Sequence, residues 1–354
     1  MLYSLFRPLL FALDPEIAHD AALAGLDAAA SLGIAQRIAP RLPPSPVEAM
    51  GLRFPNRIGL AAGLDKNARH IDGLASLGFG FIECGTVTPR PQPGNPPPRL
   101  FRLAQAQALI NRLGFNNDGV ERFLANVARA RFGPKSGGIL GLNIGRNFDT
   151  PNERAVDDYL TCLRAVYAHA SYVCVNVSSP NTAGLRELQE DTALGALLAA
   201  LKAEQAELAQ RHGKYTPLAV KLAPDLSPEA IRSIARVLVA QRCDAVIATN
   251  TTLDRTGVTD LDHAGEAGGL SGRPLRDKAT AVVRALAAEL GGALPIIGVG
   301  GILTGADAQE KIAAGATLVQ IYTGLIYKGP ELVAEIAAAL APRETGAPLK
   351  APRP

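Results

Sequence analysis

The stretch YVCVNVSSPN, residues 172–181, decides the fold of this chain. Its first part, from Tyr172 to Val175, is an apolar and β-branched run of the kind that forms a buried strand. The run then ends in Asn176, Ser178 and Ser179, which are small hydrogen-bonding residues without charge. A buried strand that stops at a row of amides and hydroxyls presents those groups together at one edge of a sheet.

Runs of this type recur along the chain and alternate with helical stretches, which indicates a parallel sheet. Eight such runs predict a closed (β/α)8 TIM barrel of the α/β class, and a doubly wound sheet is the alternative. No G-x-G-x-x-G follows the first run, so a dinucleotide fold lacks its phosphate cradle. The predicted strands are residues 58–63, 81–88, 139–145, 172–178, 218–224, 245–252, 296–302 and 318–324, and the predicted helices are residues 68–77, 119–131, 152–170, 192–211, 227–241, 276–290, 304–313 and 330–340.

The first 33 residues differ from this repeat and predict a small two-helix extension. One helical face carries the apolar residues, and Asp14-Pro15 ends the first helix and begins the second. Arg7 and Pro8 interrupt the apolar stretch, which excludes a signal peptide, and the charged residues from Asp14 onward leave too few apolar residues for a membrane span. The helices either lie on a membrane surface or pack on their own domain. The apolar residues of the first face are Leu2, Leu5, Phe6, Leu9, Leu10 and Leu13.

We therefore divide the chain into an N-terminal helical segment (1–39), a barrel (47–342) and a C-terminal tail (343–354), with a proline-rich linker (40–46) before the barrel. The 354 residues are 47% hydrophobic and 19% charged, as expected of a large core. A net charge of +3 without a Lys/Arg block argues against a nucleic-acid partner. The scattered cysteines predict buried reduced thiols, and the five histidines show no metal-binding spacing, so we expect no metal. The cysteines are Cys84, Cys162, Cys174 and Cys243.

In this barrel class the active site lies at the carboxyl ends of the strands, and polar residues follow nearly every predicted strand here. Each asparagine offers a donor and an acceptor on one planar head, so a set of them matches a flat ring with alternating N–H and C=O groups. Lys66 adds a positive charge suited to a carboxylate. The expected ligand is flat, amide-like and singly anionic, as a pyrimidine carboxylate is. The glycines of residues 298–301 fit a phosphate site or, alternatively, a tight turn.

Lys221 lies inside a predicted strand, where a buried ammonium needs an anion. It could form a Schiff base, as in barrel aldolases, or hold its charge beside a flavin that becomes anionic on reduction. The asparagines and threonines around it, with few carboxylates, favour the flavin. The polar rim also argues against a non-catalytic membrane-surface module. The proline-rich residues 89–98 are either a surface excursion or a wall of the site.

Four motifs make the sequence resemble the dihydroorotate dehydrogenase family along nearly its whole length: AGLDKN (62–67), NRLGFNN (111–117), NVSSPNT (176–182) and GLSG (269–272). The two-helix extension, and serine rather than cysteine at the base position, resemble the quinone-using class 2 branch. The resemblance implies oxidation of (S)-dihydroorotate to orotate in de novo pyrimidine (UMP) biosynthesis. FMN would be the hydride acceptor and a membrane quinone the final electron acceptor. It also suggests a monomer held peripherally on the cytoplasmic side of the cell inner membrane.

The resemblance further implies residue roles. Ser179 would be the catalytic base that takes a proton from C5, while the C6 hydride passes to flavin N5, and Thr182 with a water would carry the proton onward. The quinone would reach the flavin between the N-terminal helices, near His19, Arg102 and Tyr322. Substrate-binding residues would be Lys66, Asn111, Arg112, Leu113, Gly114, Phe115, Asn176, Asn181, Asn250 and Thr251. Cofactor-binding residues would be Ala62, Gly63, Leu64, Asp65, Lys66, Thr86, Asn143, Asn176, Lys221, Thr249, Gly272, Gly301, Tyr322 and Thr323.

Overall fold

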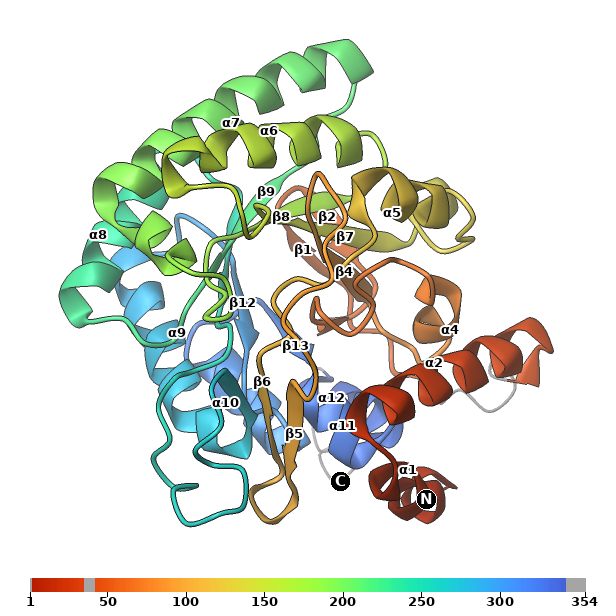
Figure 1. The fold of residues 1–354 in the computed structure, drawn as a ribbon. Helices are drawn as coiled ribbons and strands as arrows, with labels where there is room; N and C mark the ends of the chain where they lie inside the picture. Colours follow the sequence, from red (N-terminus) through yellow and green to blue (C-terminus); the bar gives the residue numbers. More distant parts are fainter. Residues whose placement is uncertain (1, 35–41, 342–354) are drawn as a thin grey trace, which may run out of the picture.

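Eight parallel strands close into a barrel in the computed structural model, which describes residues 2–34 and 42–341 (Figure 1). Each predicted run forms one strand of the barrel, so the TIM-barrel expectation is confirmed. The strands end one to four residues earlier than predicted because the polar residues at their ends leave the ladder to face the mouth of the barrel. In barrel order from the first they are β3 (Ile58–Leu60), β4 (Phe81–Val87), β7 (Ile139–Ile144), β8 (Tyr172–Asn176), β9 (Leu218–Leu222), β10 (Ala245–Ala248), β12 (Ile296–Val299) and β13 (Leu318–Ile321).

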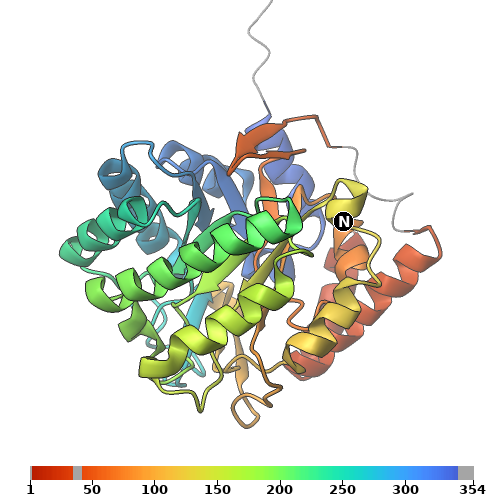
Figure 2. The same ribbon diagram turned by 90° about the horizontal axis from the view of Figure 1, so that it is seen from above.

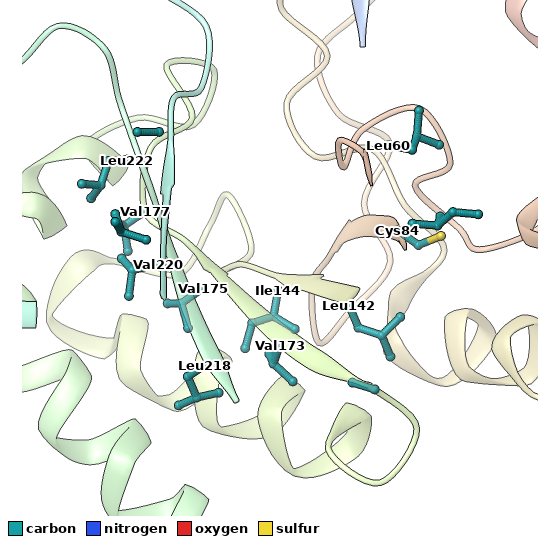
Figure 3. Close-up of a cluster of buried hydrophobic side chains, with 14 of the residues drawn as sticks. Leu60, Cys84, Leu142, Ile144, Val173, Val175, Val177, Leu218, Val220 and Leu222 are labelled. Atoms are coloured by element: carbon teal, nitrogen blue, oxygen red, sulfur yellow. The ribbon is translucent and has the colours of Figure 1, made fainter. Parts of the chain in front are cut away.

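Helices surround the barrel and cover the outward faces of its strands (Figure 2). Alternate strand residues such as Val173, Val175 and Val220 point outward into a continuous apolar layer between strands and helices (Figure 3). The four cysteines are buried and form no disulfide, as expected. The helices are α4 (Ile71–Ala75), α5 (Gly119–Val127), α6 (Ala155–Val166), α7 (Asp191–His212), α8 (Pro228–Ala240), α9 (Arg276–Leu290), α10 (Gly305–Ala313), the short and unpredicted α11 (Thr323–Lys328), and α12 (Glu331–Leu340).

The amino-terminal half of the barrel interior is filled by aromatic side chains. Phe81 and Tyr172 point inward, and glycines stand across from both of them on the neighbouring strands. A Cβ at Gly59 would lie 2.2 Å from Phe81 Cζ, and one at Gly141 would lie 2.3 Å from Tyr172 Cζ. A hairpin that the sequence did not reveal, β1 (Val47–Ala49) and β2 (Leu52–Phe54), stacks its Phe54 ring 5.1 Å from that of Phe81. Side chains therefore close the barrel at the amino-terminal ends of its strands.

A second small sheet lies over the other end of the barrel. The antiparallel strands β5 (Leu100–Leu103), β6 (Ala108–Asn111) and β11 (Gly269–Gly272) form it in the order β11-β6-β5. Its pairing of Asn111 with Gly269 joins two motifs that are far apart in the sequence. The proline-rich residues 89–98 lead into this sheet, and Gln92 and Asn95 donate to backbone carbonyls of the 111–117 loop over distances of 2.7–3.2 Å.

The N-terminal extension forms two helices, α1 (Leu2–Ala12) and α2 (Pro15–Ser31), as the sequence predicts. The Asp14 carboxylate caps α2 by accepting from the backbone N–H of Glu16 at 2.9 Å. One side of the pair packs on the barrel: Arg7 donates to the carbonyl of Tyr327 in α11 at 2.8 Å, and the Phe11 and Tyr327 rings lie 5.3 Å apart. In Figure 1 the red helices α1 and α2 accordingly lie beside α4 and α11.

The other side of α1 and α2 is apolar and open to solvent. Leu5 is 72% exposed, Leu9 68% and Ile17 60%. One face of the segment therefore packs on the barrel, as one of the two expectations had it, and the other presents large apolar side chains to solvent. Among the described residues, no helix is both long and apolar enough to cross a bilayer. The predicted tail (343–354) and the residues that join α2 to the barrel (35–41) lie outside the described residues.

Candidate active site

A cavity opens at the carboxyl ends of the strands and contains about 940 Å³ of space between atoms, part of it open to solvent. The β6 and β11 segments of the small sheet complete its wall, which explains how residues 111–115 and Gly272 reach the barrel mouth. Most of the residues singled out from the sequence line it: Ala62, Gly63, Lys66, Thr86, Asn111, Leu113, Gly114, Phe115, Asn176, Ser179, Asn181, Lys221, Thr249, Asn250, Thr251, Gly272, Gly301, Tyr322 and Thr323.

A continuous chain of hydrogen bonds runs around the mouth and explains the polar ending of β8. Asn250 Nδ2 donates to Ser178 Oγ at 3.0 Å, and Ser178 Oγ donates to Asn176 Oδ1 at 2.9 Å. Asn176 Nδ2 then donates to Thr86 Oγ1 at 2.9 Å, which donates to Asn143 Oδ1 at 2.6 Å. Every amide orientation in the chain is fixed by its neighbour, so the polar wall is rigid.

Glu83 terminates this chain, and the sequence analysis missed it. Its carboxylate is fully buried and accepts three hydrogen bonds of 2.8 Å, from Asn143 Nδ2, the Tyr172 hydroxyl and Gln320 Nε2. The signal in the sequence was a charged residue inside the otherwise apolar run 81–88. An acidic residue at an inward position of a barrel strand needs donors around it, and here they come from β7, β8 and β13.

Ser179 lies on the cavity wall with only 5% of its surface exposed. Its Oγ accepts from the backbone N–H of Asn181 at 3.2 Å, and Asn181 Nδ2 in turn donates to Asn111 Oδ1 at 3.1 Å. The nearby Thr182 hydroxyl is buried and, among the described residues, finds no hydrogen-bond partner. A buried hydroxyl without a partner is where an ordered water or a proton carrier fits.

Two polar groups in the cavity wall, the Lys221 ammonium and Gln320 Oε1, make no hydrogen bond to a described residue. They show which kind of cofactor would fit. Lys221 is 5% exposed, and no described residue accepts a hydrogen bond from its ammonium or pairs with it. Gln320 Oε1 is buried without a partner because Glu83 holds the amide nitrogen of the same side chain. A cation and an unpaired acceptor in the lining of one cavity match a flat ring that carries carbonyl oxygens and an N–H group.

Another part of the wall is built from bare backbone. Gly301 has a φ of +74°, and a Cβ there would lie 2.3 Å from Arg276 Cα at the start of α9. Only glycine fits this close approach. Thr323 Oγ1 lies 2.8 Å from Ser271 Oγ beside the same loop. This loop, with Gly272 of β11 in the same cavity wall, has the features of an anion-binding turn.

Lys66 interacts electrostatically with two side chains of α2 in the N-terminal extension. Burial lowers its pKa to about 8, with Glu16 of α2 opposing the shift. His19 of the same helix has its pKa lowered to about 4, chiefly by burial and then by the charge of Lys66. The polar side of α2 therefore lies close to the cavity lysine.

Of the three residues expected near a quinone route, only Tyr322 lines the cavity. Its hydroxyl donates to the Gly63 carbonyl at 3.3 Å. Arg102 instead holds the end of α1, donating to the Leu13 carbonyl at 2.7 Å and lying 4.9 Å over the Phe11 ring. His19 lies on α2, near Lys66.

Four of the residues predicted for binding lie behind the wall and do not line the cavity. Arg112 points away from it, pairs with Glu266 at 2.6 Å and lies 4.7 Å over the Phe101 ring. Asp65 accepts from the backbone N–H of His70 at 2.8 Å. Leu64 is in the apolar core, and Asn143 is the fully buried link to Glu83. Leu64, Asp65 and Arg112 support the wall because their neighbours in sequence form it. Asn143 supports it by accepting from Thr86, which lines the cavity, and by donating to Glu83.

The fold and the cavity together define a (β/α)8-barrel enzyme with a site for a planar, polar ligand at the carboxyl ends of its strands. In the described part of the chain, no three His, Cys, Asp or Glu side chains are grouped as metal ligands would be. A family profile described as "Dihydroorotate dehydrogenase" matches residues 46–343. The chain belongs to the dihydroorotate dehydrogenase family.

Individual relatives agree with the family. The chain is 61% identical over 341 residues to a protein of Thiobacillus denitrificans, covering 96% of this chain and 100% of that protein. It is 62% identical over 339 residues to a protein of Herminiimonas arsenicoxydans, covering 96% and 97%. Both are named dihydroorotate dehydrogenase (quinone). The crystal structure of ligand-free DHODH from Eimeria tenella is similar with a TM-score of 0.83 and 40% identity, covering 92% of this chain and 94% of that one.

Proposed function

We propose that this protein oxidises (S)-dihydroorotate to orotate in pyrimidine biosynthesis, with FMN bound in the barrel mouth and a membrane quinone as the final electron acceptor. The observation that carries the proposal is the pairing of an unpartnered, buried Lys221 with a rigid wall of neutral amides in one cavity. The name shared by relatives about 60% identical along nearly the whole chain supports the same reaction.

The cavity divides into two regions that suit the two parts of FMN. Lys221, Gln320 and Thr86 would hold the edge of the ring, and the Gly272 and Gly301 backbone with Thr323 would hold the phosphate. FMN supplies an acceptor for the hydride that leaves C6 of the substrate and a donor of the two electrons to the quinone. The full set proposed for the cofactor is Ala62, Gly63, Lys66, Thr86, Asn176, Lys221, Thr249, Gly272, Gly301, Tyr322 and Thr323, with Leu64, Asp65 and Asn143 acting from behind.

The substrate ring would be held by amides that come from three elements. Asn111 leads from β6, Asn176 and Asn181 from β8, and Asn250 with Thr251 from β10, while residues 113–115 close the wall beside them and Arg112 supports them from behind. Lys66 supplies the positive charge for the carboxylate. Neutral amides orient the ring without placing a fixed negative charge beside a cofactor that gains electrons.

Ser179 would remove the proton from C5, and the rigid loop makes this possible. A serine hydroxyl is a weak base, so its proton must pass onward as it takes another. The unpartnered Thr182 hydroxyl, with a water, is our candidate for the next carrier. Holding Ser179 in place contributes through positioning, which is worth several kcal/mol of a reaction barrier.

The N-terminal helices would place the enzyme on the cytoplasmic side of the inner membrane, as a peripheral monomer. The exposed apolar face of α1 and α2 fits a surface that dips into lipid. The side of α2 that carries Glu16 and His19 lies near the Lys66 end of the cavity, which supports a quinone route between the helices and the barrel. The segment for this role is residues 1–39, of which the structure describes residues 2–34.

An anaerobic visible spectrum of the purified protein tests the proposal. A yellow protein that bleaches when dihydroorotate is added, and recovers its colour when a short-chain quinone follows, is the expected result. A colourless, folded protein that ignores added FMN and is trapped by borohydride in the presence of substrate would instead identify Lys221 as a Schiff-base lysine, as in barrel aldolases.

A further inference from the structure

One guanidinium joins three of the loops at the barrel mouth. Arg186 follows β8 in a short 3-10 turn, and its Nε donates to the carbonyl of Ser178 at 3.1 Å. One of its NH2 groups donates to the carbonyl of Thr251 at 2.8 Å, and the other pairs with Asp225 at 3.0 Å. These acceptors belong to the loops after β8, β10 and β9, respectively.

The loops after β8 and β10 contain residues that we propose to act on or bind the substrate. Ser178 directly precedes the proposed base Ser179, and Thr251 is itself one of the residues proposed to hold the substrate. The direct side-chain link between the two loops is the 3.0 Å hydrogen bond from Asn250 to Ser178. Arg186 adds a second link through backbone carbonyls, so it fixes main-chain positions rather than a single side-chain rotamer.

Asp225, in the loop after β9, holds the Arg186 guanidinium in place. Its carboxylate also accepts from Thr252 Oγ1, from the backbone N–H of Leu253 at 2.9 Å and from Lys278 at 3.1 Å. Burial alone would raise the pKa of Asp225, but these hydrogen bonds and that from Arg186 lower it below its ordinary value. The carboxylate therefore stays charged, and Arg186 is held on both sides.

We propose that Arg186 is a positioning residue that sets the distance between the base Ser179 and the substrate amides of the β10 loop. It does not line the cavity, so it acts through the two carbonyls that it holds. The inference rests on the proposed oxidation of dihydroorotate. Proton removal from C5 then depends on a residue that never touches the substrate.

The planar fork of arginine is what the site requires. Three acceptors on three different loops lie around one delocalised group, and a lysine ammonium cannot reach all of them from a single point. Arg186→Met keeps the aliphatic stem and removes all three bonds, whereas Arg186→Lys keeps the charge beside Asp225. Misplacing a catalytic group by about 1 Å can cost about 100-fold in rate, so we expect turnover per bound FMN to fall about 10- to 100-fold in Arg186→Met and less in Arg186→Lys.

The test compares both variants with Arg164→Met, which removes an exposed arginine whose pair, Glu204, lies on the outer helices. Turnover, FMN content, orotate affinity and thermal midpoint are measured for each. The decisive readout is the isotope effect with dihydroorotate deuterated at C5. A displaced base slows proton removal, so this effect should increase in Arg186→Met while the control stays at the unmodified value.

Addition of methylguanidinium to Arg186→Ala supplies an independent check. Saturable recovery of turnover, absent in Arg164→Ala, would support the positioning role. Turnover per bound FMN within twofold of the unmodified protein, or a fall in rate with no change in the C5 isotope effect, would overturn it. If the unmodified protein itself leaves dihydroorotate unchanged, it is the proposed function that fails.

Discussion

Replacing Glu83 with glutamine tests whether the buried carboxylate organises the cavity wall. Glu83 is fully buried and accepts hydrogen bonds from Asn143, Tyr172 and Gln320. The glutamine amide has almost the same shape but only one acceptor oxygen. If that oxygen keeps the bonds from Tyr172 and Gln320, its NH2 group faces the NH2 group of Asn143.

Rotation of Asn143 does not remove this conflict. Turning the amide would present its oxygen to the new NH2 group, but Thr86, which donates to that oxygen at 2.6 Å, would then lose its acceptor. A lost charge-assisted bond with a buried donor left unpaired costs about 2–4 kcal/mol. A neutral amide is easier to bury than a carboxylate, which offsets part of this loss. We therefore expect a net destabilisation of about 1–3 kcal/mol.

Urea unfolding of the flavin-loaded protein, followed by far-UV circular dichroism, measures this change. Glu83→Gln should lower the unfolding midpoint with little change in the denaturant slope, and it should weaken FMN binding because Gln320 and Asn143 lose their fixed orientation. Glu48→Gln, on the exposed side of β1, is the matched control. Adding Asn143→Asp to Glu83→Gln moves the carboxylate from position 83 to its hydrogen-bonded neighbour at position 143 and restores an acceptor for each donor, so the double variant should recover part of the loss.

Equal unfolding midpoints for Glu83→Gln and the unmodified protein, together with equal FMN affinity, would refute this reasoning. So would a double variant that is less stable than the sum of the two single changes predicts. Either result would mean that the direction of the hydrogen-bond chain does not depend on an acceptor at position 83.

Four further predictions follow from the site and the extension. Ser179→Ala should keep FMN and orotate binding but lose about 100- to 10,000-fold of turnover near neutral pH, measured with a dye acceptor. Lys221→Ala should lose or loosen FMN, and an active variant with full flavin content would contradict its role. Because burial lowers the pKa of Lys66 to about 8, its charge is present below that pH and lost above it. KM for dihydroorotate should therefore rise about tenfold between pH 7 and pH 9, and Lys66→Arg should remove that rise. Leu5→Glu with Leu9→Glu should weaken vesicle binding and quinone reduction while dye reduction persists, and unchanged vesicle binding would exclude this face as the lipid contact.

The regular part of the fold could be read from the sequence because strand and helix periods are local. All eight barrel strands coincide with apolar runs, and α9 spans the residues predicted for it. The hairpin at β1 and β2 was missed because each strand has only three residues with a charged one in the middle, Glu48 or Arg53, so no apolar run marks it. The β5-β6-β11 sheet was missed because its third strand comes about 160 residues after the second, so only the tertiary fold brings them together.

The site shows the same division between local and long-range information. Ser179, Asn176 and Lys221 could be placed because they follow or lie in recognisable strands. Arg112 was included because it belongs to the motif at 111–117 on which the family resemblance rests, and sequence cannot tell that its side chain points away from the cavity. Glu83 and Gln320 were missed because each owes its role to the other, and the two residues lie 237 positions apart in the sequence.

The plug of Phe81 and Tyr172 fills the amino-terminal end of the barrel, and the substrate cavity opens at the carboxyl ends of the strands. With the far end of the barrel filled by side chains, orotate must depart by the opening through which dihydroorotate arrived. The rate of turnover then depends on substrate entry and product release at that opening as well as on the chemical step. A loop that closed over bound dihydroorotate would also delay the release of orotate. Orotate should accordingly compete with dihydroorotate for the same opening. A higher affinity of the cavity for the pyrimidine ring would therefore slow product release and with it the whole catalytic cycle.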